Sequence, residues 1–94
     1  MNLTKTQMVE INKIASSIKD MEVTPTDEKI YEIVYFLTKE RKKQNLSQDE
    51  LAIKSGLTKN TISRIETFVS TPSLAALIQI SNALDLDIII SNQK

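Results

Sequence analysis

The side chains of this chain that could do chemistry are charged and hydrogen-bonding groups, and most of the basic ones lie in the middle of the sequence. Residues 38–70 carry seven basic and four acidic side chains. Residues 1–37 carry four basic and six acidic ones, and residues 71–94 carry one basic and two acidic ones. The net charge is therefore +3 in the middle, −2 before it and −1 after it, which sums to zero over the 94 residues. A basic segment between acidic ends is typical of a surface that faces a polyanion.

Two residue types that most enzymes and metal sites use are missing. The chain has no cysteine, which excludes disulfides, thiolate ligands and a thiol nucleophile, and no histidine, the commonest general base and transition-metal ligand. We therefore expect a protein that is not an enzyme and that binds no metal or other cofactor. No apolar run reaches the roughly 20 residues that a membrane helix needs, and no signal peptide opens the chain. We expect a cytoplasmic protein with no membrane partner.

Hydrophobic spacing and capping residues predict a succession of helices that must position these polar groups. An apolar stripe predicts an amphipathic helix over residues 4–20. Thr24, followed by a proline at the first helical position, then opens a second helix that runs to about residue 44. Ser47 and Glu50 have the spacing of a capping box, which predicts a short helix over residues 48–54.

The second half of the chain contains further short elements. Gly56, the only glycine, can take the left-handed conformation that ends a helix. Thr58 caps a helix over residues 59–67, and Thr71 with the proline after it opens a last helix to about residue 84. The β-branched run at residues 86–91 predicts a strand. The core candidates are Ile30, Ile33, Val34, Leu37, Leu74, Leu77, Ile78, Ile80 and Leu84.

Two short capped helices, separated by a turn with one glycine, have the dimensions of a helix-turn-helix. The stretches Leu46–Ala52, Gly56–Glu66 and Thr71–Leu77, with Ala83-Leu84 after them, closely resemble the Cro and phage-repressor (XRE) helix-turn-helix family. This resemblance covers about residues 30–85. It implies an all-α, lambda-repressor-like helix-turn-helix bundle, here with an extra N-terminal amphipathic helix and a short C-terminal β-strand. The expected division is 1–24 for that helix and its linker, 25–85 for the DNA-binding domain, and 86–94 for the strand and tail.

The resemblance implies that the second helix of the motif, the recognition helix, enters the major groove of a double-stranded DNA operator. Lys59, Asn60 and Ser63 would then contact bases. Asparagine can form two hydrogen bonds with adenine, and lysine can donate to the guanine acceptors O6 and N7. Contacts to phosphates, which position a protein without reading sequence, are expected from Arg41, Lys42, Lys43, Gln48, Thr58, Thr61 and Arg64.

The resemblance also implies an ion pair and one departure from the family. An arginine of the family pairs with a glutamate that closes the recognition helix, which corresponds here to Arg41 and Glu66. The role of this pair would be geometric, since a buried pair does not reliably stabilise a fold although losing one partner is costly. Soon after that glutamate the family places a glycine and a basic residue, where this chain has Phe68-Val69. We therefore expect a differently built turn and the loss of one phosphate contact.

Two segments lie outside the motif. A lone strand has unpaired backbone groups, and pairing with the same strand of a second copy would satisfy them. We therefore expect a homodimer formed through Leu86, Ile88, Ile89 and Ile90. The N-terminal helix could fold back on its own domain, join the dimer interface or bind a protein partner. The side chains available for a partner are Met8, Ile11, Ile14 and Ile18.

The favoured interpretation is a dimeric transcriptional repressor that occupies an operator. Small antitoxins that regulate their own toxin–antitoxin operons combine a Cro-type domain, a terminal strand and an extra amphipathic segment that binds the toxin. This chain is similar in arrangement, which favours an autoregulating antitoxin with a toxin as a further partner. Two alternatives stay open: a phage or mobile-element repressor without a toxin partner, and a protein-interaction module that has lost DNA binding.

Overall fold

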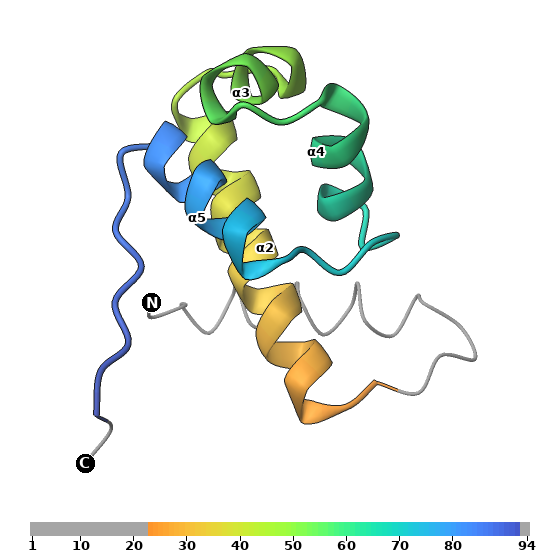
Figure 1. Ribbon diagram of the computed structural model, residues 1–94. Helices are drawn as coiled ribbons and strands as arrows, with labels where there is room; N and C mark the ends of the chain where they lie inside the picture. The colour runs from red at the N-terminus through yellow and green to blue at the C-terminus, as the bar shows by residue number, and fades with distance from the viewer. Residues whose placement is uncertain (1–22, 93–94) are drawn as a thin grey trace.

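The computed structural model describes residues 23–92, and within that range it contains four helices and no β-strand. In chain order the helices are α2 (Pro25–Lys43), α3 (Gln48–Ser55), α4 (Lys59–Glu66) and α5 (Leu74–Ala83). In Figure 1, α2 is the long diagonal helix, and the three shorter helices gather around its C-terminal half. The all-helical architecture is therefore confirmed. The amphipathic helix expected over residues 4–20 lies outside the described residues.

The core lies where the four helices meet. Because α3 and α4 have only eight residues each, they are too short to be stable helices alone and depend on this packing. Within residues 23–92 the buried apolar side chains are Val34, Leu37, Leu51, Ala52, Ile62, Ile65, Ala76, Ile80 and Leu84. Two of the predicted core residues are wrong: Leu74 and Ile78 are 68% and 43% exposed. They lie on the outer face of α5, which packs inward through Ala76 and Ile80.

A serine or threonine caps the start of each described helix by accepting a hydrogen bond from a backbone N–H three residues on. The four capping residues are Thr24, Ser47, Thr58 and Ser73. Ser47 and Glu50 form the predicted capping box, in which the Ser47 backbone N–H and hydroxyl hold the pKa of Glu50 below its ordinary value. The last helix begins at Leu74 rather than at Pro72, because Ser73 is the residue that caps it.

The helices end in residues with left-handed backbone conformation. Gly56 closes α3 with φ = 75°, as predicted, and the other three are Asn45, Phe68 and Asp85, with φ near 60°. After α4 the Phe68 N–H bonds the Ile65 carbonyl and the Val69 N–H bonds the Arg64 carbonyl, which is the paired pattern of a Schellman turn. Asparagine and aspartate tolerate this conformation, whereas for phenylalanine it is a genuine outlier.

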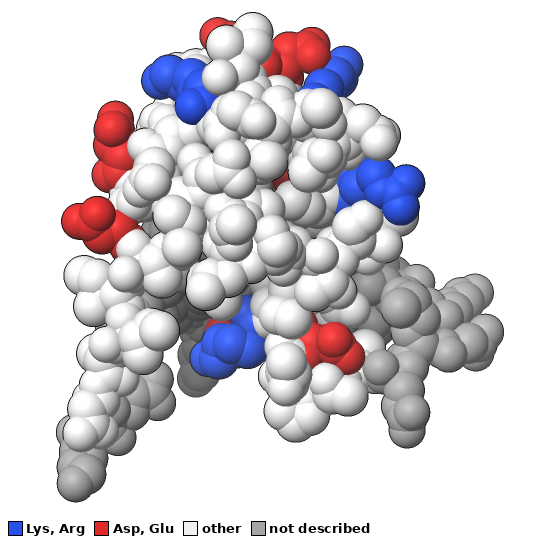
Figure 2. Space-filling model, viewed as in Figure 1, with Lys and Arg blue, Asp and Glu red and all other residues white. Residues whose placement is uncertain are grey.

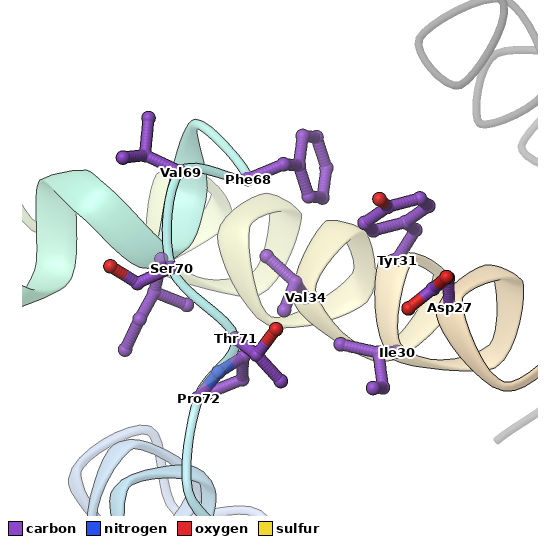
Figure 3. Close-up of a pocket in the computed structure, with 10 residues that line it drawn as sticks. Asp27, Ile30, Tyr31, Val34, Phe68, Val69, Ser70, Thr71 and Pro72 are labelled. Carbon is purple, nitrogen blue, oxygen red and sulfur yellow. The ribbon is translucent and has the colours of Figure 1, made fainter. Parts of the chain in front are cut away.

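Phe68 therefore corrects the expectation of a differently built turn, since it adopts the conformation that glycine would supply. Its ring packs edge-on against Tyr31 of α2, with the ring centroids 4.9 Å apart and the planes at 71°. Figure 3 shows the two rings next to each other among the side chains that line a cleft, with Ile30 and Val34 nearby, while Val69 points the other way. An edge-to-face aromatic pair contributes about 0.5–1.5 kcal/mol beyond its buried area, which offsets the strained backbone.

The predicted strand is not formed in the single chain. After α5 the Leu86 N–H bonds the Ser81 carbonyl and the Leu86 side chain packs against the core. Ile88, Ile89 and Ile90 are exposed, and the segment runs away from the bundle as the extended tail in Figure 1. A strand needs a neighbour for its backbone hydrogen bonds, and the described part of one chain offers none here. None of the described helices is long and apolar enough to cross a membrane.

We expect Phe68→Gly to lower the free energy of unfolding by about 1 kcal/mol, because losing the aromatic pair and gaining backbone entropy outweigh the relief of strain. In a Tyr31→Ala background the same replacement should cost clearly less, since the ring pair is already gone. Urea unfolding of the wild type, the two single variants and the double variant measures this coupling. An equal cost of Phe68→Gly in both backgrounds would show that Tyr31 does not support the turn.

Candidate nucleic-acid interface

Helices α3 and α4 form the two halves of the helix-turn-helix. The chain leaves α3 at Gly56, where the left-handed backbone lets the Leu57 N–H reach the Ala52 carbonyl at 3.1 Å. Thr58 then caps α4 through the Thr61 N–H at 3.1 Å, so only three residues separate the helices. The Thr61 hydroxyl also lies 2.9 Å from the Thr58 hydroxyl, so both the backbone N–H and the hydroxyl of Thr61 have a partner within the protein.

Helix α4 buries one face and presents the other. Ile62 and Ile65 are inside the core, whereas Lys59, Asn60 and Arg64 are exposed. Ser63 and Thr61 are half-buried at the edges of that outer face. Within residues 23–92 no hydrogen bond occupies the side-chain amide of Asn60, and Arg64 donates from Nε to the Ser70 hydroxyl at 3.0 Å. The three predicted base readers are thus on one helix, with Lys59 and Asn60 the more accessible.

A buried ion pair joins α2 to α4. The Arg41 guanidinium grips the Glu66 carboxylate with two hydrogen bonds, Nε to Oε2 at 2.7 Å and Nη2 to Oε1 at 2.9 Å. Their side chains are only 9% and 10% exposed. The remaining terminal nitrogen of Arg41 donates to the Leu46 carbonyl at 2.6 Å, at the start of the segment that leads into α3. A two-bond pair of this kind fixes direction as well as distance.

Gln48 brings α3 into the same network. Its side-chain amide donates to Glu66 Oε1 at 3.0 Å, so one carboxylate holds groups from α2 and α3 against α4. The amide of Gln48 thus supports the recognition helix, in addition to being a candidate for the phosphate contact that the resemblance implies. Arg41, however, is buried and all three of its nitrogens donate within the protein, which leaves it poorly placed for the phosphate contact expected of it.

The other candidates for phosphate contacts lie at the surface. Lys42 and Lys43 are exposed in the last turn of α2, where Lys43 approaches Glu40 at 3.9 Å. Thr58 is exposed at the start of α4. On the face in Figure 2, basic and acidic groups are scattered among uncharged ones rather than gathered into one patch. Binding to a polyanion would therefore depend on a few placed cations.

Sequence reasoning missed a charged contact between the two helices of the motif. Asp49, the second residue of α3, lies 3.5 Å from the ammonium group of Lys59, the first residue of α4, measured from Oδ2 to Nζ. The short turn joins the C-terminal end of α3 to the N-terminal end of α4, so the approach of Asp49 to Lys59 depends on how the two helices pack, and no signal in the sequence could have revealed the pair. Ser70, which holds Arg64, was missed because its position depends on the turn at Phe68.

We expect Glu66→Gln to lower the free energy of unfolding by about 3 kcal/mol, because it leaves the buried Arg41 charge without its partner. The matched control is Asp49→Asn, which removes a carboxylate from the pair with Lys59, in which both side chains are exposed. That change should cost less than about 1 kcal/mol, as for other exposed pairs. Urea unfolding at neutral pH compares the two, and similar small losses would contradict the structural role of the buried pair.

Comparisons with known proteins place the chain in a family. The family model described as helix-turn-helix matches residues 37–90, more than half of the sequence. An uncharacterised HTH-type transcriptional regulator of Sinorhizobium fredii is 43% identical over 54 residues, which cover 57% of this chain and 28% of that protein. The matched region thus spans little more than a quarter of the relative. No solved structure matches the chain. The chain belongs to the XRE-type helix-turn-helix family.

Proposed function

We propose that this protein is a sequence-specific DNA-binding transcriptional repressor that inserts α4 into the major groove of its operator. The observation that carries the proposal is the exposed Lys59–Asn60 face on a helix that the Glu66 carboxylate fastens to both α2 and α3. In a helix-turn-helix the first helix crosses the DNA backbone and the second contacts bases with its N-terminal residues. Helices α3 and α4 have the order and the short turn that this geometry needs. The relative from Sinorhizobium fredii carries the name of a transcriptional regulator, which agrees with this role.

The reading surface has the chemistry to discriminate bases. Asn60, whose amide is free of partners within the described residues, can bond N6 and N7 of adenine together. Lys59 can donate to O6 or N7 of guanine, and the half-buried Ser63 is short enough to approach a thymine methyl. Around them, phosphate contacts are assigned to Lys42, Lys43, Gln48, Thr58, Thr61 and Arg64.

The proposed repressor acts as a homodimer. A single domain of this size makes few phosphate contacts, and two copies on a palindrome double them. The tail supports this proposal, since Ile88, Ile89 and Ile90 are exposed and the backbone there has no partner within the described chain. Pairing two tails as antiparallel strands would satisfy those groups symmetrically and cover the isoleucines.

The biological setting that we favour is an autoregulated toxin–antitoxin operon. In this setting the segment with Met8, Ile11, Ile14 and Ile18 binds the toxin, while the domain represses the operon. A phage or mobile-element repressor would share the same domain and lack that partner. A neighbouring reading frame that encodes a toxic protein separates these two settings. An interaction module without DNA binding is disfavoured by Asn60, because its side chain is exposed on the outer face of α4 and makes no hydrogen bond within the described residues.

Asn60→Ala should lower the discrimination between operator and scrambled DNA by about 1–3 kcal/mol, because it removes a base-specific pair of hydrogen bonds. Lys43→Ala is the contrasting variant: it should weaken binding to both duplexes equally and flatten the dependence on salt by about one ion. Binding titrations at two salt concentrations measure both effects. Equal losses on the two duplexes for Asn60→Ala would remove its base-reading role.

Ile89→Asp should weaken self-association of the free protein by about tenfold or more, which corresponds to roughly 1.4 kcal/mol. The helical domain should stay folded, since Ile89 is exposed and lies outside the core. Ile53→Asp is the matched control, because Ile53 is an equally exposed isoleucine on α3. Sedimentation equilibrium without DNA compares the variants. A dimer that survives Ile89→Asp would require another interface.

A further inference from the structure

The ion pair between Asp49 and Lys59 lies on the surface that the proposed function turns towards DNA. Asp49 is 65% and Lys59 60% exposed at the level of the side chain, and their charged atoms are 3.5 Å apart. An exposed pair of this kind contributes little to stability. An acidic residue in the first turn of α3 suits the helix dipole, but the dipole does not require that this carboxylate lie beside the exposed cation at the start of α4.

The two acidic residues at the start of α3 have different surroundings. Glu50 accepts a hydrogen bond from the Ser47 backbone N–H at 3.0 Å and so completes the capping box. Asp49 makes no hydrogen bond within residues 23–92, and the charged group that it contacts there is the ammonium of Lys59. The first helix of the motif crosses the phosphate backbone. A carboxylate there opposes the positive end of the helix dipole that would otherwise attract any phosphate.

We propose that Asp49 is a specificity-determining residue of the DNA-binding surface, a role that rests on the proposed function. On unrelated DNA, Asp49 repels the phosphates and keeps Lys59 from serving as a general phosphate contact. At the correct site, the guanine acceptors O6 and N7 replace Asp49 as the partner of Lys59. Discrimination gains when a wrong site is penalised as well as when the right one is rewarded. The carboxylate thus lowers affinity for all DNA but lowers it least where a guanine faces Lys59.

The test compares Asp49→Asn with the wild-type chain on two duplexes. One duplex is the tightest sequence that the wild type selects from a random library, and the other is the same duplex scrambled. Asp49→Asn should tighten binding to scrambled DNA by about fivefold, the order expected from removing one like charge near a phosphate. Because the freed Lys59 becomes a phosphate contact there, the slope of log K against log salt should steepen by about one. On the selected duplex, both changes should be markedly smaller, so the ratio of the two affinities falls.

Glu50→Gln is the matched control, since it removes the same charge from the same helical turn and glutamine can also complete a capping box. This variant should change the affinity for both duplexes by the same factor and leave the ratio of the two affinities unchanged. In a Lys59→Gln background, Asp49→Asn should no longer tighten binding to scrambled DNA more than binding to the selected duplex, because the cation that Asp49 restrains is absent.

The outcomes separate the inference from the function on which it rests. Wild-type protein that binds no duplex even at low salt would overturn the proposed function itself. Wild-type protein that binds DNA, with Asp49→Asn tightening both duplexes equally or acting like Glu50→Gln, would overturn the role of Asp49 alone. A preference for scrambled DNA that persists without Lys59 would also overturn it.

Discussion

The rest of this structure depends on one buried guanidinium. Arg41 donates from Nε and one terminal nitrogen to the Glu66 carboxylate and from the other terminal nitrogen to the Leu46 carbonyl. Gln48 of α3 donates to the Glu66 carboxylate as well. Three helices and the segment between two of them therefore meet at one point. Replacing such a pair with apolar groups is often neutral or stabilising, so its value lies in direction rather than in net free energy. Here it holds the C-terminal end of α4 against α2 and α3, with the exposed face of α4 turned outward.

The ends of the helices show how a chain with a single glycine closes its turns. Gly56 lies in the turn of the helix-turn-helix, where only three residues separate the end of α3 from the start of α4. The turns after α2 and α5 use asparagine and aspartate, whose short polar side chains tolerate the left-handed region. After α4 the residue is Phe68, and the Tyr31 ring takes over the stabilising role. The turn that positions Ser70 and Arg64 is thus tied by an aromatic contact to the N-terminal half of α2.

Much of this fold could be predicted because its signals are local. Thr24, Ser47 and Thr58 cap helices where the spacing of polar and apolar residues places them, and Gly56 ends α3 as its type demands. The errors fall where position depends on tertiary packing. Leu74 and Ile78 are apolar but face outward, since periodicity alone does not say which side of α5 meets the core. The predicted strand at the tail is not formed for a similar reason, because a strand needs a neighbouring strand and residues 23–92 contain none.

In the candidate site, too, local features could be predicted from the sequence and contacts between helices could not. That Lys59 and Asn60 share the outer face of α4 follows from helical spacing around Ile62 and Ile65. The engagement of Arg41 inside the protein and the approach of Asp49 to Lys59 depend on how α2, α3 and α4 are packed, which no local pattern encodes. Contacts between helices therefore decide which of the basic side chains are available to a ligand.

The central claim is that α4 and the start of α3 form the DNA-facing surface. The most direct measurement is a nuclear magnetic resonance titration of the ¹⁵N-labelled protein with duplex DNA at low salt, where even unrelated sequences are bound. We expect the backbone amide shifts to change most for residues 48–49 and 58–64, and little on the outer face of α5. Shift changes centred on the cleft between Tyr31 and Phe68, or none at saturating DNA, would contradict it.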